Sequence, residues 1–263
     1  MKDTIRKISV VTPSLNQGGF IERTIQSVQN QIVDAEVEHI VIDGGSTDET
    51  LDILKGYGSK IRFTSGPDRG MSDALNTGFA LCTGEIVGWL NSDDLFLPGT
   101  LQKVADYFSG HPDCLWLYGN CNMVEENDRE VRKWITAYKV RKSARFSYRR
   151  LLVENFISQP SVFFRKSIFE KTGMLDINLK TAMDYDLWLR FSTLGKPGVI
   201  PDFLASFRVH QRSISARNIR KQFEEQYAIH QRYDQNKFRL FRHRTMIFLI
   251  VGVYTALHFF RRK

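Results

Sequence analysis

Short apolar runs alternate with amphipathic helical patterns through residues 1–110, and this alternation is the feature that most constrains the fold. The apolar runs, which are typical of buried strands, are residues 8–11, 39–42, 61–65 and 85–90. The helical patterns between them are residues 20–31, 46–54 and 71–82. In the second helical pattern, Ser46 or Thr47 is the expected N-cap. Strands and helices in alternation predict a mostly parallel sheet with helices on both faces, so we expect an α/β fold.

Each predicted strand ends in polar residues, in chain order TPSLNQ, DGGSTD, SGPDRG and NSDD. In open α/β sheets, ligands bind beyond the carboxyl ends of the strands. The last of these sequences places two adjacent carboxylates, Asp93 and Asp94, directly after a buried strand. A divalent cation such as Mg²⁺ or Mn²⁺ would offset their repulsion and leave positions open for phosphate oxygens. The alternative is that the two residues form a turn or a helix N-cap before residues 95–101.

The four strand-end sequences, taken together and in order, resemble the family 2 glycosyltransferases over roughly residues 6–213. The resemblance implies the GT-A fold, a nucleotide-diphosphate-sugar donor and a hexosyl transfer with inversion at the anomeric carbon. NSDD falls where the family carries its metal motif, although Asn91 replaces the usual first acid. The resemblance therefore implies Asp93 as the ligand of Mn²⁺ or Mg²⁺, with Asp94 assisting and Ser92 beside them in the donor site.

The resemblance also implies a set of residues around the donor nucleotide. Those after the first strand are Pro13, Ser14 and Asn16, and those on the segment that closes over the nucleoside are Asp68, Asp73 and Asn76. Asp43, after the second strand, is expected to contact the base or the ribose. Gly44 stands where the family often has a second acid, and this departure leaves the identity of the base open.

An inverting transfer needs a base that takes the proton of the acceptor hydroxyl, and residues 181–191 offer Asp184 and Asp186. On a helical wheel Asp184 falls within the apolar arc, where burial would raise its pKa toward the range useful to a base. Asp186 falls outside that arc beside Arg190, which indicates a surface ion pair. The ED motif of the family also falls at Met183-Asp184. We predict Asp184 as the base; the alternative is a buried Asp that stabilises a loop.

Two further residues follow from the resemblance. His210 precedes Ser213 by three residues, a spacing that the family often has near the diphosphate or the metal. Its neighbours Arg208 and Arg212 favour an anion-facing loop over an ordinary surface histidine. Gln159 is expected on the acceptor side of the cleft, where it would orient a hydroxyl.

The net charge of +8 is divided unevenly along the chain. Residues 1–130 carry ten basic and twenty acidic residues, whereas residues 131–153 carry eight basic residues and no acid. Residues 205–263 carry thirteen basic and three acidic residues. Such basic blocks indicate an anionic partner or, as the alternative, a solvated face.

Residues 245–260 carry no Asp, Glu, Lys or Arg and would form a helix of about 24 Å, shorter than the ~30 Å hydrocarbon core of a bilayer. We therefore expect this tail to lie in the cytoplasmic leaflet on anionic lipid rather than to span the membrane. The alternatives are a helix packed on the catalytic domain and an oligomer contact. We expect a catalytic domain at residues 1–215 and a basic helical segment at residues 216–263.

Compartment and partners complete the hypothesis. Three cysteines without metal-type spacing indicate a reducing compartment, so we expect the cytoplasmic face of the inner membrane. The expected activity is transfer of a sugar to a lipid-linked or saccharide acceptor in bacterial surface-polysaccharide synthesis, with no nucleic-acid partner. Two other classes stay open: a metal-dependent phosphoryl-transfer enzyme, and a non-catalytic module that binds anionic lipid or nucleic acid. No G-x-G-x-x-G follows the first strand, which argues against a dinucleotide-dependent oxidoreductase.

Overall fold

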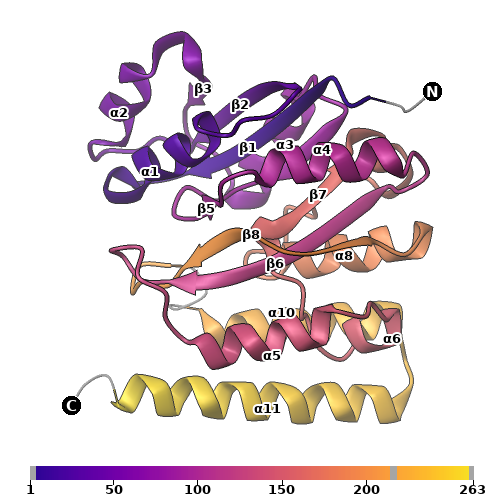
Figure 1. Cartoon of the computed structure of the whole chain (residues 1–263). Helices are drawn as coiled ribbons and strands as arrows, with labels where there is room; N and C mark the ends of the chain where they lie inside the picture. Colours follow the sequence, from indigo (N-terminus) through magenta and orange to yellow (C-terminus); the bar gives the residue numbers. More distant parts are fainter. Residues whose placement is uncertain (1–3, 214–217, 261–263) are drawn as a thin grey trace.

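The computed structural model describes residues 4–213 and 218–260 and shows one open, curled sheet with helices around it (Figure 1). Its strands lie in the spatial order β3-β2-β1-β4-β7-β6-β8-β5. Their bounds are β1 (Lys7–Ser14), β2 (Glu36–Asp43), β3 (Arg62–Ser65), β4 (Ile86–Trp89), β5 (Leu95–Phe96), β6 (Trp116–Val124), β7 (Val162–Arg165) and β8 (Gly198–Arg208). The four strands predicted from the sequence are β1 to β4, and the α/β class is confirmed.

The sheet is mostly parallel, as predicted, but two of its strands, β5 and β7, run in the opposite direction. β1 to β4 pair only in parallel with one another, as predicted from their alternation with helices. β7, however, runs antiparallel to both β4 and β6, and β5 runs antiparallel to β8. The prediction rested on residues 1–110, whereas β7 comes later in the chain. It lies between β4 and β6 and runs in the opposite direction to both. Its direction depends on a chain reversal that no local pattern encodes.

Helices cover both faces of the sheet. The helices are α1 (Gly18–Gln29), α2 (Thr50–Gly56), α3 (Met71–Leu81), α4 (Thr100–Gly110), α5 (Lys133–Ser143), α6 (Tyr148–Leu151), α7 (Phe169–Thr172), α8 (Met183–Leu194), α10 (Ile219–Tyr233) and α11 (Lys237–Phe260). Val11 and Phe164 point to the face covered by α3 and α8, and their neighbours Val10 and Phe163 point to the face covered by α1 and α4. Successive strand residues therefore bury both faces, as expected for a sheet between two helical layers.

The helix α8 is anchored on the sheet by aromatic side chains. The ring of Trp188 stacks on that of Trp116 from β6, with centroids 6.0 Å apart and an interplanar angle of 9°. Phe191, one turn later, contacts Trp116 and Phe164 edge-on. Stacked and edge-on aromatic pairs add about 0.5–1.5 kcal/mol each to ordinary burial. This packing fixes α8 as a rigid element of the fold.

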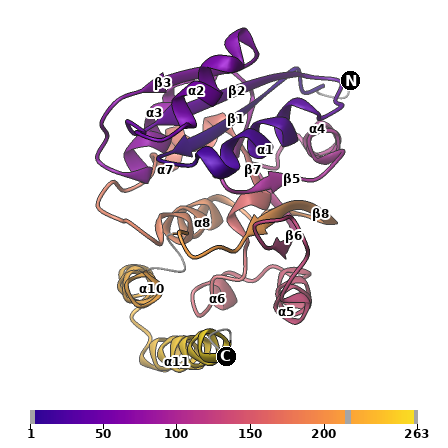
Figure 2. The ribbon, with the colours of Figure 1, turned by 90° about the vertical axis from the view of Figure 1, so that its left-hand side faces the viewer.

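The C-terminal helices lie on the side of α8 that faces away from the sheet. Figures 1 and 2 show α10 beside α8, and α11 running along the edge of the molecule below α5, α6 and α10. The buried side chains of His230 and His243 join α10 to α11, with their Nδ1 atoms 2.6 Å apart, and His243 Nδ1 lies 2.9 Å from the carbonyl of Leu152. The expected boundary between residues 215 and 216 lies outside the described residues.

The predicted tail at residues 245–260 is part of α11, which begins at Lys237. The side chains of residues 253–260 lie outside those that the structure describes. In the part of the chain that can be assessed, no helix combines the length and the apolar character needed to cross a bilayer.

A close contact between α3 and β1 generates a prediction about stability. A Cβ atom at Gly78 would lie 2.3 Å from Val11 Cγ1, so Gly78→Ala should overpack the core and lower the free energy of unfolding by about 1–3 kcal/mol. Urea denaturation followed by circular dichroism measures this change. Gly19→Ala is the matched control, because a Cβ atom there meets nothing within 4 Å. Equal stability of the two variants would contradict the close packing.

Candidate active site

The carboxyl ends of the parallel strands lie at one edge of the sheet, as the sequence predicts. Ser14, at the end of β1, pairs with Asp43 at the end of β2, and Asp43 pairs with Ser65 at the end of β3. Pro13 precedes Ser14 in β1 and pairs with Ile42. Ser14 Oγ is buried and has no hydrogen-bond partner among the described residues. The carboxyl ends of the parallel strands thus converge, and the buried hydroxyl of Ser14 at this edge has no partner among the described residues.

Asp43 organises the loop that follows β2. Its carboxylate is 1% exposed and accepts hydrogen bonds from Ser46 N (2.9 Å), Ser46 Oγ (2.5 Å) and Ser65 Oγ (2.7 Å). Ser46 Oγ in turn accepts one from the backbone N–H of Asn16 (2.7 Å) in the loop after β1. The helix α2 therefore begins only at Thr50, and the prediction of Ser46 or Thr47 as its N-cap is wrong because Ser46 is held by Asp43.

Gly44 stands where the family often has a second acid, and the carboxylate of Asp68 lies beside this glycine. A Cβ atom built on Gly44 would lie 2.8 Å from Asp68 Oδ2. The other oxygen of this carboxylate, Oδ1, accepts a hydrogen bond from Gly70 N (2.7 Å), which holds the side chain in this place. Asp68 comes from the loop after β3 and is exposed. An acidic group therefore lies beside position 44 although residue 44 is glycine.

Two other residues predicted near the nucleoside have partners within the protein. Asp73 accepts a hydrogen bond from Arg69 Nη2 (2.7 Å), and this bond holds the pKa of Asp73 below its usual range. Asn76 Nδ2 donates to the carbonyl of Leu175 (2.9 Å), and Asn76 Oδ1 accepts from Leu175 N (3.0 Å). Asn76 thus fastens the segment before α8 to α3.

The structure brings Asp93 and His210 together across 117 residues of sequence. Asp93 Oδ2 lies 2.8 Å from His210 Nε2. The imidazole stacks near Phe20 of α1, with ring centroids 4.5 Å apart, and its Nδ1 has no partner among the described residues. Ser213 Oγ donates to the carbonyl of His210 (3.0 Å), so the predicted His-to-Ser spacing forms a turn that holds the histidine.

Asp94, predicted to assist in metal binding, faces the interior of the protein. Its carboxylate is fully buried; Oδ1 accepts from the backbone N–H of Arg208 (2.9 Å) and Oδ2 from Asn91 Nδ2 (3.2 Å). Burial and the adjacent charge of Asp93 raise the pKa of Asp94. Ser92 is also buried, and its carbonyl accepts a hydrogen bond from Thr24 Oγ1 (2.9 Å). Asp93 is therefore the carboxylate of this motif that can reach a ligand.

Gln159 lies against the same motif. Its Oε1 accepts from Asn91 Nδ2 (3.0 Å) and its Nε2 donates to the carbonyl of Trp89 (2.6 Å). Both ends of the amide are thus engaged with the end of β4. Asn91, which replaces the usual first acid of the family motif, is a hydrogen-bond partner of this amide.

Asp184 lies in the first turn of α8 and is partly buried. Burial raises the pKa of this carboxyl, whereas the Tyr185 N–H, the Asn155 amide and the charge of Lys139 oppose the rise. Asn155 Nδ2 donates to Asp184 Oδ2 (3.2 Å). Asn155 comes four residues before Gln159, which contacts Asn91 of the NSDD motif. Because four residues span at most about 14 Å, the backbone of Asn155 lies within that distance of Gln159.

Asp186 is buried, which contradicts its predicted place on the surface. The expected ion pair is present, with Arg190 Nε 2.9 Å from Asp186 Oδ2, but the other oxygen accepts a hydrogen bond from Tyr233 of α10 (2.9 Å). The helical wheel assigned this face to solvent because it contained no information about α10.

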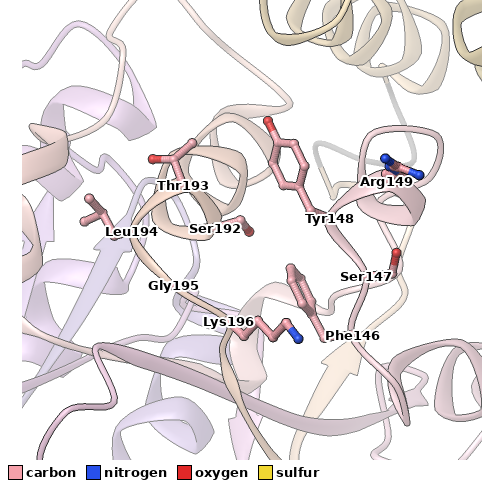
Figure 3. A pocket seen from close by; sticks show the side chains of 9 residues that line it. All are labelled: Phe146, Ser147, Tyr148, Arg149, Ser192, Thr193, Leu194, Gly195 and Lys196. Atoms are coloured by element: carbon pink, nitrogen blue, oxygen red, sulfur yellow. The ribbon is translucent and has the colours of Figure 1, made fainter.

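Residues that sequence reasoning missed are Lys139, Asn155 and Glu225. Lys139 Nζ lies 3.3 Å from Ser158 Oγ, and its charge acts on Asp184. Lys139 belongs to the basic block at residues 131–153, which was its only signal in the sequence. No pattern in the sequence distinguished Asn155 or Glu225. A separate hollow at the far end of α8, between Tyr148 and Lys196, is lined by none of the predicted site residues (Figure 3).

Known proteins with related sequences are glycosyltransferases. The model of glycosyl transferase family 2 matches residues 9–173. An uncharacterized glycosyltransferase of Mycobacterium tuberculosis is 31% identical over 205 residues, which cover 76% of this chain and 74% of the relative. A PGL/p-HBAD biosynthesis glycosyltransferase of Mycobacterium bovis is 30% identical over 187 residues, covering 69% of this chain and 68% of the relative.

Solved structures share the fold at lower identity. TarS 1-349 of S. aureus, in complex with UDP-GlcNAc, aligns with a TM-score of 0.66 at 19% identity over 85% of this chain and 65% of that one. The chain spans 39% of the longer TarS structure. The mannosyltransferase PcManGT of Pyrobaculum calidifontis, in complex with GDP-Man and Mn²⁺, aligns with a TM-score of 0.66 at 18% identity over 97% of this chain and 81% of that one. The mixed sheet and these neighbours fit the GT-A fold.

The extent of the family match and the 30–31% identity of the relatives agree with the strand-end motifs and with the site that they form. The chain belongs to glycosyl transferase family 2.

Proposed function

We propose that this protein transfers a sugar from a nucleotide-diphosphate-sugar to an acceptor hydroxyl, with inversion at the anomeric carbon. The observation that carries the proposal is the contact of Asp93 with His210 at the ligand edge of the sheet. The structural neighbours that bind UDP-GlcNAc and GDP-Man support a donor of this class. Family membership favours sugar transfer over a phosphoryl-transfer enzyme and over a non-catalytic binding module.

The donor set suits a divalent cation such as Mn²⁺ or Mg²⁺ that is shared with the substrate. Asp93 and His210 supply one carboxylate and one imidazole; His210 Nε2 donates to Asp93 Oδ2, and Nδ1 of the buried ring has no partner among the described residues. Within residues 4–213 and 218–260, no group of three His, Cys, Asp or Glu side chains could hold a metal alone. Diphosphate oxygens of the donor would complete the coordination, as is common for such ions. When bound, the cation would neutralise the departing diphosphate.

Around the nucleotide, Ser14 and Asp68 are the groups with capacity for a ligand. Ser14 Oγ is buried without a partner among the described residues, and the exposed Asp68 carboxylate lies beside Gly44. We assign recognition of the base and the ribose to this edge of the sheet, with Asn16, Asp73 and Asn76 supporting its loops. An acid in the position of Asp68 can accept a hydrogen bond from a base N–H or from ribose hydroxyls.

Asp184 is the proposed catalytic base. The acceptor oxygen forms a bond to the anomeric carbon while the bond to the nucleoside diphosphate breaks, and the hydroxyl proton passes to the carboxylate of Asp184. Partial burial makes this carboxylate a better proton acceptor than an exposed one. Asn155, which donates to Oδ2, orients the carboxylate.

We also propose a lipid-linked or saccharide acceptor of surface-polysaccharide synthesis at the cytoplasmic face of the inner membrane. Among the side chains of α11 that the structure describes, up to residue 252, the exposed large apolar ones are Phe238, Phe241, Phe248 and Leu249. The helix carries Lys237, Arg239, Arg242 and Arg244 and no acid from residue 237 to the end of the chain. Exposed aromatic rings among cations suit a surface of anionic lipid.

The first prediction from this proposal concerns the base. Asp184→Asn should lower kcat by about 10²–10⁴-fold and leave donor binding unchanged, because the amide cannot take a proton. In the wild type, kcat should rise with pH through the raised pKa of Asp184, since only the carboxylate acts as a base. Release of nucleoside diphosphate from UDP-GlcNAc and GDP-mannose, in the presence of candidate acceptors, measures both. Asp202→Asn, an exposed carboxylate, is the control, and full activity of Asp184→Asn would exclude this residue as the base.

The second prediction concerns the cation. Asp93→Asn and His210→Ala should each weaken Mn²⁺-dependent binding of the nucleotide-sugar by at least about 10-fold, because each removes one ligand. Isothermal titration with and without Mn²⁺ measures the affinity. Asp106→Asn, on the outside of α4, should bind as the wild type does. Metal-dependent binding that survives in Asp93→Asn would remove this residue from the metal site.

The third prediction concerns the membrane. Serine at Phe238, Phe241 and Phe248 together should reduce flotation with anionic phosphatidylglycerol liposomes, because the variant loses apolar area that enters the lipid. Zwitterionic liposomes should carry less wild-type protein than anionic ones. The matched control is Ile32→Ser, which removes an apolar side chain that is 88% exposed elsewhere on the surface. If the triple variant floats as well as this control, α11 is not the lipid contact.

A further inference from the structure

The helix that carries Asp184 is capped by a residue of another helix. α8 begins after Ala182, which has no side chain that can cap it. The carboxylate of Glu225, on α10, accepts hydrogen bonds from the backbone N–H groups of Lys180 (3.2 Å), Thr181 (2.8 Å) and Ala182 (3.1 Å). It also accepts one from Thr181 Oγ1 (2.7 Å). Glu225 thus binds three consecutive backbone donors that end at Ala182, the residue directly before α8, although it is more than forty residues away in sequence; we call this set of hydrogen bonds the Glu225 cap.

The charge of Glu225 suits this position. The N-terminal end of a helix carries a partial positive charge, which stabilises an anion placed there. Although burial opposes ionisation, the hydrogen bonds from Thr181, Lys180 and Ala182 hold the pKa of Glu225 below its usual range. The side chain is therefore ionised at neutral pH, and the cap is a charge-assisted one.

α10 holds α8 at a second point. Tyr233, two turns after Glu225, donates its hydroxyl proton to Asp186 (2.9 Å). The two contacts bracket Asp184 in the first turn of α8. The capped segment also contacts the donor side of the site, because Lys180 Nζ donates to the carbonyl of Arg69 (2.8 Å) in the loop that carries Asp68. A shift of α10 would move the start of α8.

We propose that Glu225 is a positioning residue for sugar transfer, which fixes the start of α8 and thereby the place of Asp184. This inference rests on the proposed role of Asp184 as the base. It assigns to α10 a part in catalysis, although α10 lies beyond the residues matched by the family model. A displacement of about 1 Å at a reacting group can cost ~10²-fold in rate, so the cap has a measurable consequence.

Steady-state kinetics of the full chain test the proposal. Glu225→Ala should lower kcat by about 10–100-fold while KM for the nucleotide-sugar stays within about 2-fold, because the donor site is unchanged. Glu225→Gln, which keeps one acceptor oxygen, should lie between Ala and the wild type. Glu224→Ala, the exposed neighbour on α10, is the matched control and should behave as the wild type does. Wild-type kcat in both Glu225 variants would overturn the inference.

The pH profile distinguishes positioning from a general loss of stability. Removal of the Glu225 charge frees the positive end of α8, which then stabilises the Asp184 carboxylate and lowers its pKa. The acid limb of kcat should therefore move to lower pH in Glu225→Ala, in addition to the fall in kcat. A variant that had merely lost folded protein would show the wild-type profile at reduced amplitude, and that result would count against the proposal.

Hydrogen exchange keeps this inference separate from the proposed function. In the unliganded protein, the amides of residues 180–187 should exchange faster in Glu225→Ala than in Glu224→Ala, whether or not any substrate is turned over. If Glu225→Ala fails to fold, Thr181→Ala, which removes one of the four hydrogen bonds, should show the same change to a smaller extent. Unchanged exchange would refute the cap, whereas a wild type without transferase activity would refute the proposed function alone.

Discussion

The buried guanidinium of Arg208 is the interaction on which the candidate site depends. From the end of β8, Arg208 Nε donates to the carbonyl of Asp93 (2.7 Å) and Nη1 pairs with the carboxylate of Asp128. The backbone N–H of Arg208 donates to Asp94 Oδ1 (2.9 Å). A buried guanidinium is tolerated only when it is paired and hydrogen-bonded, so these contacts must form together. They fix the loop that carries Asp93 against the strand that leads to His210.

This network explains why two adjacent carboxylates can follow a buried strand. The turn at residues 91–94 is closed by a hydrogen bond from Asp94 N to the carbonyl of Asn91 (3.0 Å), and it directs the two side chains to different surroundings. Asp94 points inward to a backbone N–H, and Asp93 points to His210. One carboxylate is thus part of the buried framework, and the other contacts His210. Asp93 and Asp94 are adjacent in the sequence, but the fold gives their side chains different partners.

The site is assembled from segments that lie far apart in the chain, and rigid elements hold each of them. Trp116 and Trp188 anchor α8 on the sheet, and Glu225 and Tyr233 hold its first turn from α10. The carboxylate of Asp68 occupies the space above Gly44 that a second acid would fill. Position-by-position comparison with a family motif finds the missing acid at residue 44 but not its replacement, because the replacement comes from another loop.

The sequence by itself determined the strands β1 to β4, the helices between them and the gathering of Asp43, Asp93 and their neighbours at one edge, because hydrophobic period and strand ends are local properties. It also predicted that His210 lies near the NSDD motif, which its contact with Asp93 confirms, whereas the role of Asp184 as the base stays a prediction. Only the tertiary structure decided the directions of β5 and β7, the burial of Asp94 and Asp186, and the cap that Glu225 places on α8. The burial of a charged side chain depends on which distant element covers it, and a window of neighbouring residues contains no record of that element.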